Sequence, residues 1–585
     1  IAWCVGEKPR GREQEGASRV PSRFSAIFSV PFEDLQGNML NLLLGLVLFE
    51  SVPFARADLP IHCIHDQVFG VWKLTFSKPT SEIQNCGYES PDRNSQHFNG
   101  QYTYKLVGVD EEELDVQPPT MTGKSSSMSN GFMGNIDWSL VYDEGIHFST
   151  KGGRSAFAFF EYQPLGEEAL QSDDVNQYQS DCTKTRIGWY HQSKGDETLF
   201  GCFKAEMAQA NSNNTSSVGK NTLQADDDMV VSPTSFVNVR KSLEDHSEPF
   251  TFNLTFIEEQ NRNPSSTWRA APHEHLHGAI TKGKAYKMLG VTKYQKPNHG
   301  WDRRTYHHRQ AAIRKKPSIM SFIESDAVKN LPKSFDWRKH LEDVDVIDQG
   351  ACGSCYSVSS TTMAEVRRKI ALSKTESLPS FMSHHANMTS TTKITFSAGD
   401  RLSPQDVLNC SPENQGCEGG YPFLVAWHAY RRGHAIAQDV SYKGEDLKNA
   451  CAAETPNGRA KAKGYGYIGG HYGAATNEAL MMDIFKHGPA TVGIDVPSTL
   501  FSYRSGIFQC GQTKHEGTNL ADLHPWESTS HAVVAYGWGT DEAGKEYWIL
   551  KNSWGKYWGE DGFFKLQRDN SDACAILSMP VGVYY

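Results

Sequence analysis

The sequence predicts an α+β protein in which an all-β domain precedes a larger domain of mixed helices and strands. From residue 58 to about 203, short stretches rich in β-branched and aromatic residues alternate with clusters of Gly, Asn, Asp and Ser, which is typical of an all-β domain. From 331 to 585 the composition becomes that of a globular domain rich in glycine and aromatic residues. A chain of 585 residues is also too long for one ordinary core, so two or three domains are expected.

Individual elements follow from the local patterns. The strands expected in the first domain lie at 68–76, 102–107, 138–142 and 156–162. In the last domain, helical patterns at 356–372 and 404–408 flank a stretch rich in Ser, Thr and His at 373–397. We interpret that stretch as a surface insertion.

The N-terminal region carries the pattern of a signal peptide. Met39 is followed by the apolar run 42–49 and then by a small-x-small cleavage pattern that ends at Ala57. A membrane anchor is the alternative, but a spanning helix needs about 20 apolar residues, and Glu50 and Pro53 interrupt this run. We therefore expect a signal peptide at 39–57, with 1–38 as an upstream extension.

Cysteine usage agrees with a secretory route. Cleavage after Ala57 would start the mature chain at Asp58 and remove Cys4, one of twelve cysteines. One nucleophile among the remaining eleven would leave ten, enough for five disulfides in an oxidising compartment. Sequons for N-glycosylation point the same way and lie at Asn213, Asn214, Asn253, Asn387 and Asn409. The expected location is therefore the secretory pathway, in a vesicle or outside the cell.

Charge argues against several partners. The formal net charge of -10 and the pI near 6.1 give no long-range attraction for nucleic acid or anionic membranes. Basic residues do cluster at 303–316, inside the polar stretch 204–330. We interpret 204–330 as a solvated linker or a pro-region removed by proteolysis rather than a nucleic-acid patch.

Four residues in the last domain could together form a site with a cysteine nucleophile. Cys355 stands at the start of a helical pattern, and a helix N-terminus favours the thiolate. Attack on an amide also needs an imidazole and a donor for the developing oxyanion, roles that His531 and Gln349 would fill. Asn552 would bind the second imidazole nitrogen and fix its tautomer.

Other interpretations exist for each residue taken alone. Cys352 and Cys355 could form half of a zinc site or a redox pair, but no second pair has matching spacing and no thioredoxin-like unit surrounds them. His531 could be an ordinary strand histidine and Asn552 a turn residue. The adjacent pair His384 and His385 lacks a Cys or carboxylate partner, so no metal site is expected.

Taken together, the motifs resemble the papain family of cysteine peptidases. The runs are QGACGSCY at 349–356, SHAVVAYGWG at 530–539 and YWILKNSWG at 547–555. The resemblance implies a two-lobed catalytic domain with a helical lobe and a β-barrel lobe. It also implies substrate binding by Gly419 and Gly420, and an indole, Trp554, that covers the Asn and His pair.

Disulfide pairing is implied by the resemblance as well. In the catalytic domain the pairs are Cys352 with Cys417, Cys410 with Cys451, and Cys510 with Cys574. In the first domain they are Cys63 with Cys182 and Cys86 with Cys202.

The first domain resembles the barrel-like exclusion domain of the cathepsin C (dipeptidyl peptidase I) branch of that family, through stretches such as 58–60, 70–72 and 157–162. In that branch this domain blocks the cleft beyond the second substrate residue, and the N-terminal aspartate, here Asp58, binds the substrate's free ammonium. The implied activity is removal of dipeptides from free N-termini.

Further implications concern partners and ions. The branch assembles through the exclusion domain, so a homo-oligomer is implied, and processing proteases would remove the pro-region and separate two chains near Asp522. No cofactor is required. Phe423 stands where the branch has a chloride-binding tyrosine, which weakens the expectation of a chloride ion.

Two alternative functions stay open at this stage. One is a cathepsin-like endopeptidase with an appended β domain, and the other is a catalytically silent binding protein on a peptidase fold.

Overall fold

A computed structural model of the chain describes the residues from 61 onward except for several gaps. The described residues are 61, 63, 67–88, 106, 108, 110–116, 138–150, 153–166, 178–194, 197–210, 247–288, 321–342, 345–375, 393–447, 450–452, 454–510, 530–569 and 574–585. The proposed signal peptide, Asp58 and residues 376–392 of the insertion expected at 373–397 lie outside them. Residues 373–375 belong instead to the helix Cys355–Thr375.

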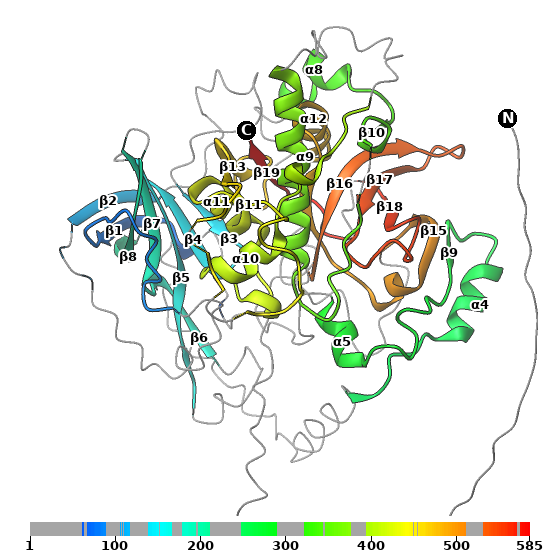
Figure 1. Cartoon of the computed structure of the whole chain (residues 1–585), viewed down its shortest axis with the longest axis horizontal. Helices are drawn as coiled ribbons and strands as arrows, with labels where there is room; N and C mark the ends of the chain where they lie inside the picture. The colour runs from blue at the N-terminus through cyan, green and yellow to red at the C-terminus, as the bar shows by residue number, and fades with distance from the viewer. Residues whose placement is uncertain are drawn as a thin grey trace, which may run out of the picture. The chain divides into compact units, whose positions relative to one another are not determined.

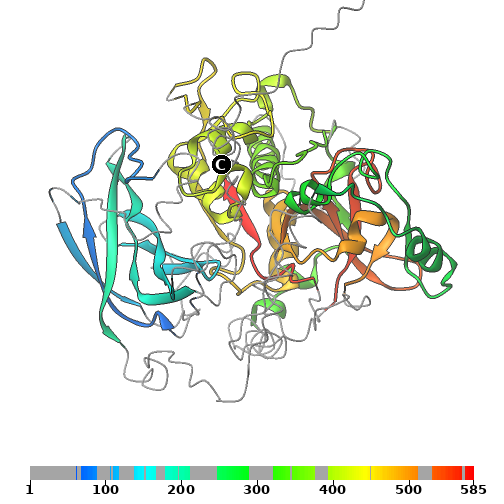
Figure 2. The same cartoon turned by 90° about the horizontal axis from the view of Figure 1, so that it is seen from below.

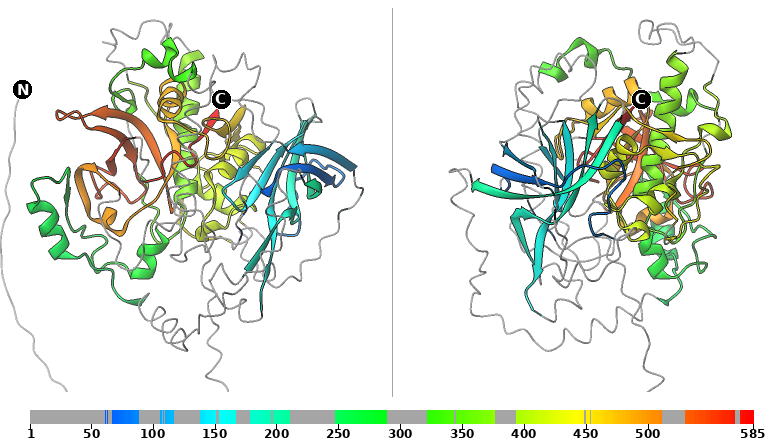
Figure 3. Two further views of the ribbon diagram at one scale, coloured as in Figure 1. Left: turned by 180° about the vertical axis from the view of Figure 1, so that it is seen from behind. Right: turned by 60° about the vertical axis from the view of Figure 1, so that its left-hand side comes forward.

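The first domain is an eight-stranded antiparallel sheet, drawn from blue to teal in Figures 1 and 3. Its strands are β1 Gly70–Phe76, β2 Asp110–Val116, β3 Trp138–Val141, β4 Gly145–Ser149, β5 Arg154–Pro164, β6 Tyr178–Thr185, β7 Gly188–Lys194 and β8 Glu197–Ala210. Both β6 and β7 pair with β5 on one side and with β8 on the other, so they form one interrupted strand between β5 and β8.

Alternation along β1 shows why this sequence forms a strand. Trp72, Leu74 and Phe76 are fully buried, whereas Lys73 between them is exposed, as a half-buried strand requires. The strands predicted at 68–76, 138–142 and 156–162 are confirmed as β1, β3 and β5, whereas 102–107 lies outside the described residues except for Leu106. Strand β8 continues to Ala210, seven residues beyond the domain boundary expected at 203.

Part of the polar stretch after this domain is folded. It contains α4 Leu254–Arg262, β9 Trp268–Ala270, α5 Lys282–Lys287 and α8 Asp326–Lys329. Strand β9 pairs antiparallel with β15, Tyr503–Phe508, of the last domain. The buried indole of Trp268 packs on Tyr503 and Phe508, so this part of 204–330 is docked on the last domain rather than solvated.

The last domain combines helices, a nine-stranded sheet to which the preceding stretch contributes β9, and a separate two-stranded sheet. Its helical elements are η6 Trp337–Lys339, α9 Cys355–Thr375, η7 Ala398–Asp400, α10 Pro404–Cys410, η8 Gly416–Glu418, α11 Pro422–Arg431, α12 Asn477–His487 and η9 Ser498–Ser502. Its strands are β10 Phe335–Asp336, β11 His434–Ala435, β12 Arg459–Ala460, β13 Gly464–Tyr467, β14 Ala490–Ile494, β15, β16 His531–Thr540, β17 Glu546–Lys551, β18 Phe563–Gln567 and β19 Val581–Tyr584.

Helix α9 lies between the two halves of this domain. It packs on α10 and α11 on one side and on β16 on the other, an arrangement visible in Figure 2. Small Ser, Thr and Ala side chains in its first three turns let these neighbours approach closely, and the residues 355–366 are buried. Helix and sheet therefore meet at the N-terminus of α9, where Cys355 stands.

Candidate active site

Cys355 is the first residue of α9, as the sequence predicted. The Cys352–Cys417 disulfide holds the preceding turn, and the hydroxyl of Tyr356 donates to the carbonyl of Gly416, 3.0 Å away. The thiol is only 4% exposed and lies near the backbone of Ala532, the residue after His531, which acts to lower the pKa of the thiol. Cysteine and histidine are thus brought together from the two halves of the domain.

His531 and Asn552 form a hydrogen-bonded pair at one end of two adjacent strands. His531 begins β16, Asn552 follows β17, and imidazole Nε2 lies 2.7 Å from Asn552 Oδ1. Because an amide oxygen only accepts, Nε2 must carry the proton and Nδ1 is left as a base. Nδ1 makes no hydrogen bond to any described residue. The fully buried indole of Trp554 lies with its ring centre 5.0 Å from that of His531.

Gln349 is fixed beside this pair by its backbone and its side chain. Its N–H donates to the carbonyl of Ser553, and its Oε1 accepts from the Ser553 hydroxyl at 2.5 Å. The amide Nε2 donates to the carbonyl of Cys352 at 2.9 Å and to the carbonyl of Met288 at 3.2 Å. An N–H group suited to an oxyanion therefore contacts a backbone carbonyl of the segment after α5.

Burial decides the charge of the pair in this structure. It raises the pKa of the Cys355 thiol to about 11, despite the nearby N–H groups, and lowers the pKa of His531 to about 4, despite the Asn552 hydrogen bond. Burial therefore favours the neutral thiol and the neutral imidazole in this structure.

Gly419 and Gly420 lie against the residues around Cys355. A side chain on Gly353 would meet the carbonyl of Cys417 at 2.6 Å, and one on Gly420 would meet the Tyr356 ring at the same distance. Gly419 has φ +130°, which other residues rarely adopt. The backbone of Gly419 and Gly420 therefore packs closely on Gly353 and Tyr356, which flank Ser354 and Cys355. Substrate binding by these two glycines stays a prediction.

Other predicted residues have mixed outcomes. Asp58 lies outside the described residues, so the structure gives it no position. The Phe423 ring stacks on Tyr467, with centres 4.5 Å apart, and has no donor for an anion.

The Asn409 sequon is a correction: Asn409 is 4% exposed inside α10 and its amide bonds Gln405 and the carbonyl of Ala450, so it offers no site for a glycan.

The structure joins the five cysteine pairs that the family resemblance implied. They are Cys63–Cys182, Cys86–Cys202, Cys352–Cys417, Cys410–Cys451 and Cys510–Cys574. Cys355 is the free cysteine among the described residues, as a nucleophile must be.

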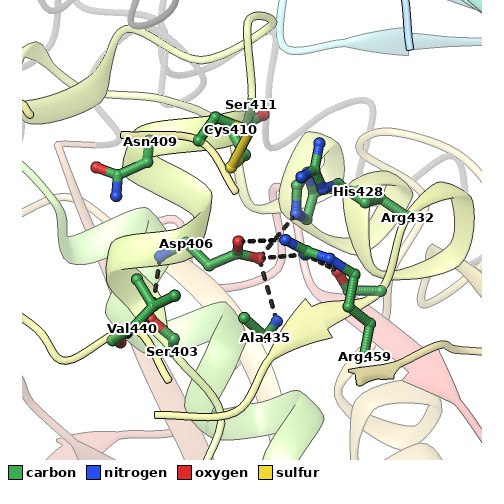
Figure 4. Close-up of polar contacts among 12 residues, drawn as sticks. Ser403, Asp406, Asn409, Cys410, Ser411, His428, Arg432, Ala435, Val440 and Arg459 are labelled. Atoms are coloured by element: carbon green, nitrogen blue, oxygen red, sulfur yellow. Dashed lines mark hydrogen bonds and ion pairs between the residues drawn. A yellow bond between two sulfur atoms is a disulfide. The ribbon is translucent and has the colours of Figure 1, made fainter. Parts of the chain in front are cut away.

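One group in the described part of the chain has side chains that metal ions use. Asp406, His428 and His434 are buried with their ligand atoms within 4.8 Å of one another. However, Arg459 already binds both carboxylate oxygens of Asp406, at 2.8 and 2.9 Å, as Figure 4 shows. This guanidinium neutralises the carboxylate and would repel a dication, so the cluster is a buried ion pair flanked by histidines.

None of the described helices is long and apolar enough to span a membrane. The paired histidines at 384 and 385 and the expected chain separation near 522 fall outside the described residues.

Comparison with known proteins identifies the domain that carries these residues. The papain family cysteine protease profile matches residues 331–383 and 380–584. A cysteine endopeptidase with a KDEL tail from Arabidopsis thaliana is 30% identical over half of this chain, which covers 72% of that protein. The chain belongs to the papain family of cysteine proteases.

Two relatives of this papain-family chain extend over nearly its whole length. Cathepsin C from Schistosoma mansoni is 26% identical, with 92% of this chain and 97% of the relative covered. Dipeptidyl aminopeptidase 1 from Plasmodium falciparum is 24% identical, with 93% and 94% covered. The cathepsin C exclusion domain profile matches residues 58–207, the region of the eight-stranded sheet.

Sequence reasoning missed two residues of this papain-family site. Ser553 orients Gln349 and directly follows Asn552, so its position in the motif was a usable signal. Met288 contributes only its backbone carbonyl, which no side-chain pattern could reveal.

Proposed function

We propose that this chain is a cysteine exopeptidase that removes dipeptides from the free N-termini of peptides and proteins. The main observation is the match of the cathepsin C exclusion domain to 58–207, upstream of a papain-family domain, in a chain of which two relatives cover 92% and 93%. A five-disulfide framework fits a secretory or lysosomal setting.

The proposed chemistry uses the residues around the thiol. His531 Nδ1 takes the proton of Cys355 as sulfur bonds to the scissile carbonyl carbon, and the resulting imidazolium protonates the leaving amine as the C–N bond breaks. Water, deprotonated by the same imidazole, then cleaves the thioester. Gln349 Nε2 and the N–H groups at the start of α9 stabilise the oxyanion in both steps.

Dipeptide specificity is assigned to Asp58, the first residue after the proposed signal peptide. Its carboxylate would pair with the substrate ammonium, which at about 4 Å and an effective dielectric constant of 20 is worth about 4 kcal/mol before desolvation. That is enough for at least a tenfold preference. Assembly through the exclusion domain and processing by other proteases belong to the same proposal.

The test compares dipeptidyl reporters with a free amine and the same reporters carrying an N-acetyl group, using processed protein. We expect turnover of the free-amine reporter and at least tenfold less of the acetylated one. Equal turnover of acetylated, internally cleaved peptides would replace the proposal with an endopeptidase. Failure of Cys355 to react with an epoxide or vinyl sulfone would indicate a silent binding protein.

A further inference from the structure

A side chain of the eight-stranded domain reaches the segment 419–421, the proposed substrate wall. Glu144 lies in the turn between β3 and β4, and Tyr421 lies between Gly420 and the start of α11. The Tyr421 hydroxyl donates to Glu144 Oε2, across 277 residues of sequence. Both are buried, with Glu144 1% and Tyr421 8% exposed, so the bond is shielded from solvent.

The turn that carries Glu144 is fixed from its own domain. The Glu144 carbonyl accepts the N–H of Phe160 at 3.0 Å, and the neighbouring Asp143 carbonyl accepts that of Cys63 at 2.8 Å. Tyr142 has φ +58°, a conformation that persists in a non-glycine residue only where surrounding contacts impose it. The carboxylate is therefore presented at a set position rather than on a freely moving loop.

Tyr421 is in turn tied to the residues around the nucleophile. Its N–H donates to Asn414 Oδ1 at 2.8 Å, and the same amide oxygen lies where a Gly420 side chain would be. Gly420 itself approaches the ring of Tyr356, the neighbour of Cys355. A displacement of Tyr421 would thus shift the glycine backbone beside the thiol.

We propose that Glu144 is a positioning residue for substrate binding, holding Tyr421 and through it the Gly419–Gly420 backbone in register with Cys355. A hydrogen bond to a carboxylate is stronger than one between neutral groups, and burial strengthens it further. The exclusion domain then shapes the substrate wall as well as limiting the length of the cleft. This inference rests on the proposed function.

The test is a double-mutant cycle on KM and kcat, with processed protein and a free-amine dipeptidyl reporter. We expect Glu144→Ala and Tyr421→Phe each to raise KM about tenfold while kcat stays within about twofold, because the wall binds the ground state and the transition state alike. The double variant should be no worse than either single one, since both remove one interaction. Glu144→Gln retains an acceptor oxygen and should recover most of the loss. Glu197→Ala, an exposed position of the same domain, is the matched control and should leave KM unchanged.

Three results would overturn the inference. The first is an unchanged KM in both single variants, and the second is a double variant in which the two effects on KM multiply. The third is a fall in kcat as large as the rise in KM, in variants with a lowered melting temperature. Tyr421→Phe removes one oxygen atom and keeps the ring, so it should fold even if Glu144→Ala does not. Failure of the proposed function has a separate signature, because wild-type protein would then turn over acetylated peptides as well as those with a free amine. In that case the same variants would be compared with wild-type protein on the acetylated peptides.

Discussion

The carbonyl oxygen of Met288 lies 3.2 Å from Nε2 of Gln349 and 3.4 Å from Nε1 of Trp554. Both donors belong to the active site, and Met288 follows α5 in the stretch between the two domains. A backbone carbonyl of the chain itself thus accepts the hydrogen bond of Gln349 Nε2, the donor that the proposed substrate oxyanion would need. We call this arrangement, with the Met288 carbonyl bound to Gln349 and Trp554, the covered state.

Removal of the segment that carries Met288 should activate the enzyme. We expect proteolytic processing before Leu331 to raise kcat/KM on a dipeptidyl reporter by at least about 100-fold, because the competent state is rare while the segment is docked. Trp268→Ala, which truncates the buried indole of β9, should raise the basal activity of unprocessed chain by about tenfold. Leu254→Ala, at an exposed position of α4, is the control. A full-length chain as active as the processed one would contradict this role.

Alkylation of Cys355 should report the covered state directly. Burial raises the pKa of this thiol to about 11, so the thiolate fraction at pH 7 is about 10⁻⁴. We expect iodoacetamide to label unprocessed protein slowly, about tenfold faster per pH unit between 7 and 9, and processed protein rapidly at pH 7. Mass spectrometry of the peptide containing Cys355 gives the rates. A pH-independent, rapid reaction of the unprocessed chain would show that the thiol is already ionised.

Loss of the Asn552 side chain should lower kcat more than it changes KM. Asn552→Ala removes the acceptor that keeps the proton on His531 Nε2, so the imidazole can adopt the tautomer that cannot serve as base. We expect kcat to fall about 10- to 100-fold. Asn457→Ala, at an exposed position of the same domain, should retain wild-type kcat. A normal kcat in Asn552→Ala would remove the orienting role.

Local motifs predicted the elements that carry the proposed catalytic residues, whereas the long-range contacts of the site could not be predicted. Each of these residues lies in a run of sequence whose pattern indicates the element. Cys355 begins a helix, His531 begins a strand, and Asn552 follows a strand. The Glu144–Tyr421 hydrogen bond depends on how the eight-stranded domain docks on the helices of the last domain, and no sequence pattern around either residue encodes it. The Asn409 sequon failed because a three-residue pattern carries no information about burial in α10.

Glycosylation should distinguish the two sequons that the structure describes. Asn253 is exposed at the N-cap of α4 and accepts from the N–H of Phe256 through Oδ1, so its nitrogen remains available for a glycan. We expect glycosidase treatment in heavy-oxygen water to convert Asn253 to labelled Asp in secreted, unprocessed protein and to leave Asn409 unlabelled. Peptide mass spectrometry reads both sites in one sample. A glycan on Asn409 would contradict its burial.

Acid should destabilise the contact between the two folded domains through His147. Its Nε2 lies 2.9 Å from both Ser155 Oγ and Tyr465 Oη, and its ring contacts Phe423 and Trp427. Burial lowers the pKa of His147 to about 3, below the unfolded value of about 6.5. The unfolded chain therefore binds a proton that the folded chain does not between these values. Stability is highest above pH 6.5, and is lost as pH falls toward 3.

The size of this effect at pH 5 follows from the 1.5 pH units below the unfolded pKa, which correspond to about 2 kcal/mol. We expect His147→Gln to reduce the loss of unfolding free energy between pH 7 and pH 5 by about that amount, measured by urea denaturation with tryptophan fluorescence. Tyr465→Phe removes a partner of His147 without removing the titrating group, so it should lower stability equally at both pH values. An unaltered pH dependence in His147→Gln would assign the acid sensitivity to other buried histidines, such as His191, whose pKa burial also lowers.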